Sequence, residues 1–319
     1  MTAVQNLLPL EPQARERVWG GQRLLPHDPP IGELWCAFED SRVRSGVEAG
    51  RTVRELTAAH GADFVGSMVA SRFPGRFPLL IKLLDCADWL SVQVHPNDEQ
   101  AQQLEGSGQF GKTEAWHFIE AESGATILAG TRPGTSPAQL ASAIRTGRIL
   151  EVSLSAAVHP GETYLLHAGT MHALGPGLVL YEVQQSSDIT YRVFDWDRPA
   201  SAGRQLHIEQ AVAVTDAQRQ AIRTSPAISN TQASTVAVGC SYFVLDVLNL
   251  ADTPATGDTA FATFHVLTVK SGAVVVACGG ETVRLDKYDT AIVAASAGTY
   301  AMHALEESAA VLRARVPDR

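Results

Sequence analysis

The segment from Ser91 to Glu114, S-V-Q-V-H-P-N-D followed later by G-K-T-E, holds side chains that could do chemistry. Ser91, Gln93 and His95 alternate with apolar residues, so we expect their side chains to leave one face of a strand. Lys112 and Glu114 form a second alternating pair. Imidazole, carboxylate and carboxamide groups suit a hard-to-borderline divalent metal such as zinc. The segment therefore predicts one half of a metal site.

The other half is predicted in H-P-G-E-T-Y-L-L-H-A-G-T-M-H-A-L-G, which runs from His159 to Gly175. A Gly-Glu turn, a short apolar strand, an Ala-Gly turn and then His172 have the layout of the second cupin motif, whose histidine points into a small β-barrel. His95, Glu114 and His172 would together supply two imidazoles and one carboxylate, the ligand set of a catalytic zinc site with an open position. Gln93 is the expected fourth protein ligand, although an amide binds metal more weakly.

Several strings along the chain resemble the type I mannose-6-phosphate isomerases, and in particular their short bacterial class. The specific ones are Q-V-H-P, K-T-E and Y-R-V-F-D-W-D-R, which occur in the family's order. V-W-G-G (Val18 to Gly21), L-L-I-K-L-L-D (Leu79 to Asp85) and A-G-T-M-H-A-L-G accompany them, so that the resemblance spans about residues 9–210. Two departures are His167, where the family usually has proline, and I-G-E-L-W-C-A-F in place of G-E-S-W-E-I-S.

The resemblance implies an enzyme that interconverts mannose 6-phosphate and fructose 6-phosphate by enediol proton transfer. It implies one Zn²⁺ per chain, with Gln93, His95, Glu114 and His172 as ligands. It also implies a catalytic arginine at Arg192. The further residues that it places against the substrate are Trp19, Ser91, Lys112 and Glu182.

Aldose–ketose isomerisation requires chemical roles that these residues could fill. The reaction needs a base, and positive charge near the developing oxyanion. Arg192 keeps its proton, so it suits negative charge in the transition state or on the phosphate. Lys112 is the expected second cation, a catalytic and substrate-binding residue whose loss should raise KM more than it lowers kcat if it mainly grips the phosphate. Glu182, with Asp188, could shuttle the proton or orient the arginine. The base stays open among His95, Lys112, Glu182 and metal-bound water.

Two interpretations from other classes are weighed against an isomerase. A cupin of the dioxygenase type would use iron or manganese at the same ligands and would need oxygen. A non-catalytic cupin would bind a sugar phosphate without turnover. Neither interpretation gives a clear chemical role to the charged residues Lys112 and Arg192, so the isomerase is favoured.

Composition limits the partners. The chain has 319 residues, with 25 basic and 34 acidic side chains and a net charge of −9, which argues against broad nucleic-acid binding. No apolar run is long enough to span a membrane, and the N-terminus lacks the features of a signal peptide. The four cysteines have no C-x-x-C spacing, which indicates reduced thiols. We expect a cytoplasmic monomer or homodimer whose partner is a hexose phosphate.

The pattern of apolar residues predicts a mainly β fold of two cupin (jelly-roll β-barrel) domains, with a few helices inserted in the N-terminal part. We expect a catalytic metal-binding cupin over residues 1–217, a Pro/Ser/Thr-rich linker over 218–236, and a degenerate cupin without metal over 237–319. The last part weakly repeats the second motif, and aligning the two A-G-T turns puts Ala301 in the place of His172.

Local signals predict individual elements. Two short helices are expected within residues 50–66, a third after the Asn97-Asp98 cap, and a fourth from Ser136-Pro137 to Gly147. Ser271-Gly272 and Gly279-Gly280 are expected as hairpin turns between C-terminal strands. The first 30 residues are expected to be irregular, because they are rich in proline and arginine.

Overall fold

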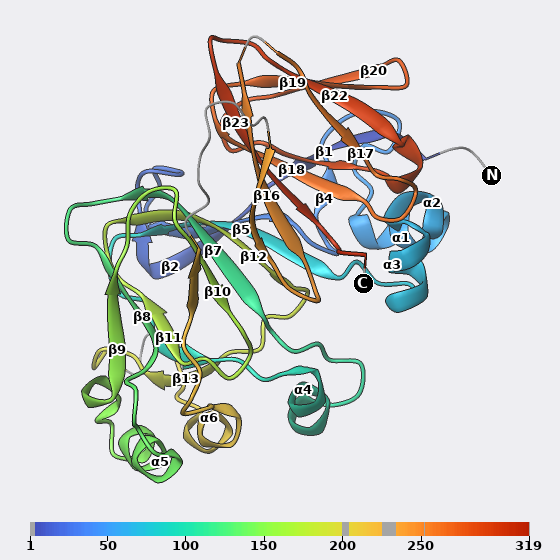
Figure 1. Ribbon diagram of the computed structural model, residues 1–319. Helices are drawn as coiled ribbons and strands as arrows, with labels where there is room; N and C mark the ends of the chain where they lie inside the picture. The colour runs from blue at the N-terminus through green and yellow to red at the C-terminus, as the bar shows by residue number, and fades with distance from the viewer. Residues whose placement is uncertain (1–3, 200–203, 225–233, 252, 319) are drawn as a thin grey trace. The chain divides into compact units, whose positions relative to one another are not determined.

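The computed structural model describes residues 4–199, 204–224, 234–251 and 253–318 (Figure 1). The chain divides into two compact units. The first unit consists of Met1–Gln13, Leu34–Lys82 and Pro226–Arg319, and the second of Ala14–Glu33 and Leu83–Ser225.

These units are interleaved in the sequence, whereas the expected domains 1–217 and 237–319 are consecutive. The physical reason is strand pairing at long range, since β1 (Leu7–Glu11) pairs with β21 (Thr290–Val293) near the other end of the chain. Of the expected linker, Ile222–Thr224 forms β14 and β15 begins at Ser234, while residues 225–233 lie outside the described residues. A metal-free role for the C-terminal part stays a prediction.

The first unit contains a seven-stranded and a four-stranded antiparallel sheet. The order in the larger sheet is β15 (Ser234–Gly239), β16 (Val244–Leu250), β23 (Ala309–Arg315), β18 (His265–Ser271), β21, β1 and β4 (Arg42–Val43). The order in the smaller is β17 (Ala255–Asp258), β22 (Thr299–Ala304), β19 (Val274–Cys278) and β20 (Glu281–Leu285). The hairpin turn expected at Gly279-Gly280 is confirmed, because it joins the paired strands β19 and β20. The one expected at Ser271-Gly272 is wrong, because this turn leads from β18 in the larger sheet to β19 in the smaller one, and the two strands do not pair.

The N-terminal segment is a correction to the sequence-based expectation. Its residues are not irregular throughout, because β1 and β2 (Gln13–Gly21) are strands. Pro9 lies within β1 opposite Ala291, and the apolar side chains around it are buried. Burial and pairing with a distant strand therefore override the local signal of the proline.

Three short helices of the first unit lie together (Figure 1). They are α1 (Val53–His60), α2 (Ala62–Val65) and α3 (Ser67–Arg72), so the helical expectation for residues 50–66 is confirmed. Thr52 and Glu55 form a capping box at the start of α1. The backbone N–H of Ser67 donates to the carbonyl oxygen of Phe261 at 3.1 Å, which ties α3 to the strand-rich part of the unit, where η3 (Ala295–Ala297) also lies.

The second unit is also built on two sheets, and the mainly β fold class is confirmed. The larger has the order β14 (Ile222–Thr224), β10 (Thr163–Leu166), β7 (Glu114–Ala121), β12 (Leu178–Gln185), β5 (Leu79–Cys86), β2 and β3 (Ile31–Ala37). The smaller has the order β13 (Tyr191–Phe194), β6 (Val92–Val94), β11 (His172–Leu174), β8 (Thr126–Thr131) and β9 (Ser153–Ala157). Buried aromatic residues such as Trp116 and Phe118 fill its core.

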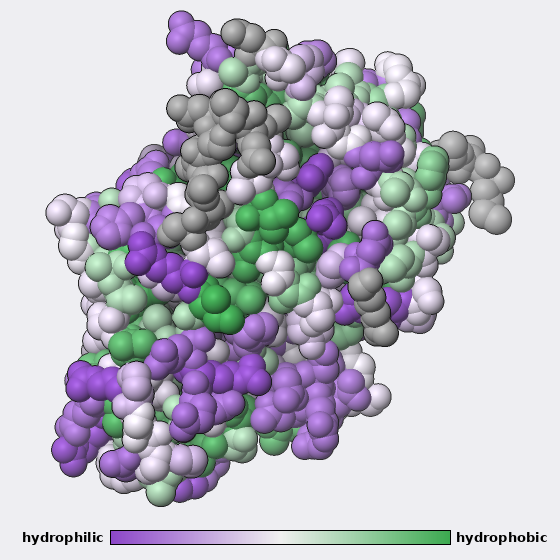
Figure 2. Space-filling view, in the orientation of Figure 1, coloured by the Kyte–Doolittle hydropathy of each residue, from purple (hydrophilic) through white to green (hydrophobic). Residues whose placement is uncertain are grey.

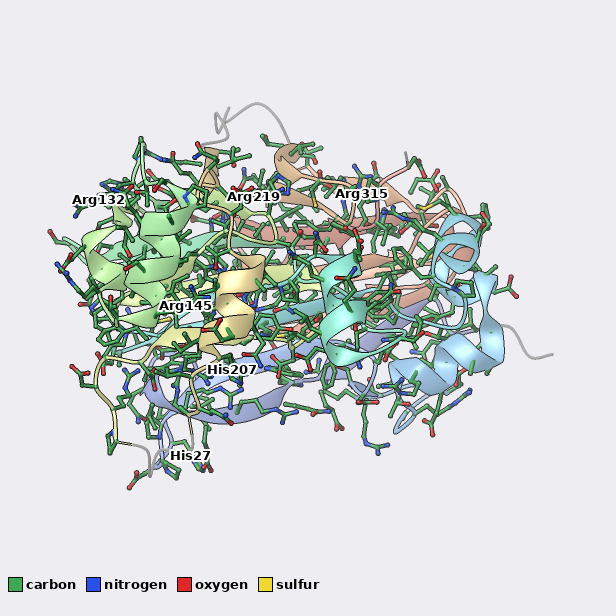
Figure 3. All side chains as sticks on the ribbon, turned by 90° about the horizontal axis from the view of Figure 1, so that it is seen from below. His27, Arg132, Arg145, His207, Arg219 and Arg315 are labelled. Carbon is green, nitrogen blue, oxygen red and sulfur yellow. The ribbon has the colours of Figure 1, made fainter. Side chains whose placement is uncertain are left out.

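Helices decorate the second unit. The capped helices α4 (Asp98–Glu105) and α5 (Pro137–Arg145) form where expected, and η1 (Ile149–Glu151) follows α5. Hydrophilic residues cover α4 in Figure 2, in keeping with its sequence D-E-Q-A-Q-Q-L-E. The sequence reading missed α6 (Ile208–Val214), which packs beside α5 through an ion pair of Arg145 with Glu209 (Figure 3). Among the described helices, none is long and apolar enough to cross a membrane.

Candidate metal centre and active site

Two imidazoles and one carboxylate meet in the interior of the second unit. One possible ligand atom from each of His95, Glu114 and His172 lies within 4.8 Å of the others. The Nε2 atoms of His95 and His172 lie 3.5 and 3.2 Å from the Glu114 carboxylate oxygens. All three side chains are at most 2% exposed. The structure therefore brings together the three ligands expected from the sequence.

Strand pairing explains why these residues meet. Gln93 on β6 is paired with His172 on β11 on one side and with Arg192 on β13 on the other. Glu114 is the first residue of β7, which belongs to the other sheet of the same unit. The two motifs of the sequence are thus neighbours in the smaller sheet, and the carboxylate reaches them from the larger one.

Hydrogen bonds orient both histidines toward this group. Nδ1 of His95 donates to the carbonyl oxygen of Ile189 at 2.7 Å, and Nδ1 of His172 donates to that of Thr170 at 2.8 Å. A carbonyl only accepts, so each proton sits on Nδ1 and each Nε2 keeps a lone pair. Burial lowers the pKa of His172 although the Glu114 carboxylate opposes the shift. A neutral imidazole with a free lone pair is the form that binds a metal.

The carboxylate and its neighbours fit a bound cation. Both oxygens of Glu114 are buried, and among the described residues Oε1 accepts no hydrogen bond while Oε2 forms an ion pair with Lys112. The Nζ atom of Lys112 lies 2.8 Å from Glu114 Oε2 and 3.2 Å from His95 Nε2, so it supplies charge at the edge of the group. A buried anion facing two imidazole lone pairs is a donor set that suits a divalent metal ion.

Glu182 and Trp19, which the sequence analysis placed against the substrate, are both buried in the second unit. Glu182 on β12 is 4% exposed, and its Oε2 accepts a hydrogen bond from Trp116 Nε1 at 2.9 Å. The Trp116 ring stands edge-on to the His172 ring, with centroids 5.3 Å apart. Trp19 is a core residue in the same hydrophobic cluster as Trp116. Its contact with a substrate stays a prediction.

Ser91 and Arg192 form the other end of the site. Arg192 on β13 donates from Nε to Ser91 Oγ at 3.1 Å and from Nη1 to the carbonyl oxygen of Gln205 at 2.9 Å. Burial lowers the pKa of Arg192, and the nearby carboxylate of Asp195 partly offsets this effect. Asp188, which the sequence offered as a partner for the arginine, is exposed.

Sequence reasoning missed two charged residues at this end. Nη2 of Arg204 also donates to Ser91 Oγ, at 3.2 Å, and its Nε lies 3.0 Å from Asp195 Oδ2. Asp195 lies within the Y-R-V-F-D-W-D-R string, but its position between Phe194 and Trp196 suggested no role. Arg204 follows a stretch without periodicity, so no signal in the sequence could place it beside Ser91.

Comparisons with known proteins bear on this arrangement. The family "Phosphomannose isomerase type I, catalytic domain" matches residues 7–113. The mannose-6-phosphate isomerase of Streptococcus mutans is 36% identical over 298 residues, covering 89% of this chain and 91% of that protein. The chain belongs to the mannose-6-phosphate isomerase family. Mannose-6-phosphate isomerase ManA of Bacillus subtilis is 34% identical, over 76% of this chain and 78% of that protein.

A solved structure supports the same membership. The mannose 6-phosphate isomerase from Bacillus subtilis matches with a TM-score of 0.86 and 28% identity, covering 97% of this chain and 99% of that one. The protein is thus an isomerase, and the family resemblance expected from the sequence is confirmed. The dioxygenase-type and non-catalytic interpretations are not favoured.

Proposed function

We propose that this isomerase interconverts mannose 6-phosphate and fructose 6-phosphate and that it holds one Zn²⁺ per chain. The observation that carries the proposal is the buried group of His95, Glu114 and His172, with both Nε2 lone pairs directed at a carboxylate. These three side chains would hold the ion, and Gln93 would be a fourth, weaker ligand. When bound, zinc supplies Lewis acidity that polarises sugar oxygens.

The side chains around this group divide the rest of the chemistry. Arg192 keeps its charge and holds negative charge that develops on the substrate. Lys112 and Glu182 are the two buried groups proposed to carry the proton between C1 and C2. Lys112 is 3% exposed and paired with Glu114, which supports work beside the ligands and not the phosphate grip expected from the sequence. The phosphate belongs at the Ser91 end, where the arginines gather.

Cell location and association are part of the proposal. The cysteines Cys36, Cys86, Cys240 and Cys278 are all free thiols. Free thiols in a chain of this size favour a reducing compartment, so we infer a cytoplasmic enzyme. Its small-molecule partner is a hexose phosphate, and it acts as a monomer or homodimer.

Nuclear magnetic resonance in D₂O tests the reaction. Incubating mannose 6-phosphate with the purified protein should yield fructose 6-phosphate with some deuterium at C1, because the side chain that takes the C2 proton can exchange it with solvent before returning it to C1. Conversion without deuterium, together with unchanged conversion in Lys112→Met and Glu182→Gln, would indicate direct hydride transfer and would remove both residues as proton carriers. No conversion at all would overturn the proposed function.

A further inference from the structure

The Ser91 hydroxyl holds two guanidinium groups side by side. Its Oγ accepts a hydrogen bond from Arg192 Nε at 3.1 Å and another from Arg204 Nη2 at 3.2 Å. A hydroxyl oxygen offers two lone pairs, so both donors can be satisfied at once. Two like charges this close repel each other, and burial adds to the cost, since it lowers the pKa of Arg204 to about 10. Such an arrangement needs an anion to offset it.

The arginines around Ser91 carry more positive charge than the neighbouring carboxylates carry negative charge. Asp195 lies 3.0 Å from Arg204 and is also 3.0 Å from Arg198, which in turn pairs with Asp88 at 2.8 Å. The hydrogen-bond acceptors of Arg192 within the described residues are a hydroxyl and a carbonyl, neither of which is charged. Three guanidiniums therefore share two carboxylates, and one positive charge is left over at Ser91.

This surplus charge lies one side chain away from the candidate metal ligands. Ser91, Gln93 and His95 follow each other along one face of a strand, where the rise is about 3.3 Å per residue. The side chains shorten this separation, because Ser91 Oγ lies 3.4 Å from Gln93 Oε1, and Gln93 Nε2 lies 3.3 Å from His172 Nε2. A hexose 6-phosphate carries its carbonyl carbon and its phosphate at opposite ends of a six-carbon chain. With C1 and C2 beside the histidines, the phosphate reaches the Ser91 end.

We propose that Arg204 is a specificity-determining residue, which binds the phosphate group of the substrate beside Arg192 and so selects phosphorylated over free hexose. This inference rests on the proposed function. A guanidinium presents two parallel N–H groups that match two phosphate oxygens, and a pair of them neutralises a dianion. Ser91 keeps the two groups aligned before the substrate arrives. Asp195 is a positioning residue, because it acts on the phosphate only by holding Arg204.

A purely structural role for Arg204 is the interpretation to exclude. In that role, its ion pair with Asp195 would only fix the chain after β13, and its loss would affect every substrate alike. The two roles therefore differ in how a neutral substrate and a free anion respond to the substitution.

Kinetics and anion binding on the full-length protein separate these roles. In Arg204→Met, KM for mannose 6-phosphate should rise about 10- to 100-fold, the effect of one lost charge-assisted hydrogen-bonding group, while kcat changes less than threefold. Activity toward unphosphorylated mannose, measured as kcat/KM at high concentration, should stay unchanged. Binding of inorganic phosphate, followed by calorimetry, should weaken by a similar factor. Arg145→Met is the matched control, since Arg145 pairs with Glu209 on the helical surface.

Several outcomes would overturn the inference. They are an unchanged KM with unchanged phosphate affinity, an equal loss on mannose and mannose 6-phosphate, or a wild-type protein that does not bind phosphate. If Arg204→Met does not fold, Arg204→Lys decides, because it keeps the charge and loses the two-pronged contact. Its phosphate affinity should fall about tenfold, and an unchanged affinity contradicts the inference. If the protein binds phosphate through Arg204 but has no isomerase activity, the proposed function is wrong and the inference about Arg204 still stands.

Discussion

Gln93 and His172 meet directly, with their side-chain Nε2 atoms 3.3 Å apart and their backbones paired across β6 and β11. His172 donates from Nδ1 to Thr170, so its Nε2 accepts a hydrogen bond from the Gln93 amide. This contact joins two motifs that lie far apart in the sequence. It also places Gln93 beside His172 Nε2, a candidate metal-binding nitrogen, so the two residues can be compared as metal ligands.

Metal content should depend on His172 more than on Gln93. Imidazole binds zinc more strongly than an amide oxygen does, so His172→Ala should lose most of its metal and Gln93→Ala should retain most of it. Elemental analysis of the purified wild type should give about one ion per chain. Two ions per wild-type chain, or full activity in His172→Ala, would show the ligand assignment to be wrong.

Arg192 should support the transition state. If the guanidinium holds charge that develops only during the reaction, Arg192→Ala should lower kcat and kcat/KM together. The loss of one such donor costs about 100- to 1000-fold. Steady-state assays of this variant and of the surface control Arg145→Ala measure the effect, with metal content checked in both. A kcat close to that of the wild type in Arg192→Ala would remove it from the mechanism.

Lys112 should act on kcat. It is buried and its Nζ lies 2.8 Å from Glu114, so it stands beside the candidate metal ligands. Lys112→Met should lower kcat by about 100-fold or more, the usual scale of a lost acid–base group, with a smaller rise in KM. The exposed Lys287→Met serves as control. A large increase in KM at unchanged kcat would restore the phosphate grip first expected for this lysine.

The candidate ligands could be picked out from the sequence because they follow local patterns. Alternation along a strand places Ser91, Gln93 and His95 on one face whatever the rest of the fold does, and the turn before His172 has its own signature. The start of α4 after Asn97 was predictable for a similar reason, since a capping box involves only four consecutive residues.

Pairing between distant segments could not be predicted in this way. The strand Leu7–Glu11 depends on pairing with β21, which lies nearly the whole chain away in the sequence. The local sequence alone therefore indicated an irregular segment rich in proline. The direction taken by Lys112, toward Glu114, depends on how the two sheets of the second unit face each other. Arg204 reaches Ser91 across a loop, and loops carry no periodic signal.

A buried histidine in the first unit should make stability depend on pH. Burial lowers the pKa of His265 from 6.5 to about 3, and its Nδ1 lies 2.8 Å from the Tyr300 hydroxyl. Between these values the unfolded chain binds a proton that the folded chain does not. This residue's contribution is therefore fully present above pH 6.5, and the free energy of unfolding falls by about 1.4 kcal/mol per pH unit as the pH drops below it.

Urea denaturation at pH 7 and pH 5 measures this slope, with chelator present so that metal release does not contribute. His265→Gln should lose this part of the pH dependence, whereas His303→Gln, at an exposed position on β22, should keep it. An identical difference between the two pH values in the wild type and in His265→Gln would rule out His265 as its source.

Metal-dependent isomerisation is the claim on which the other assignments depend, and a coupled assay of mannose 6-phosphate conversion tests it most directly. Activity should fall to background after dialysis against a chelator and return when about one equivalent of Zn²⁺ per chain is added back. His172→Ala, treated in the same way, should stay inactive. Full activity in the chelated protein, with metal analysis showing the ion removed, would contradict the account.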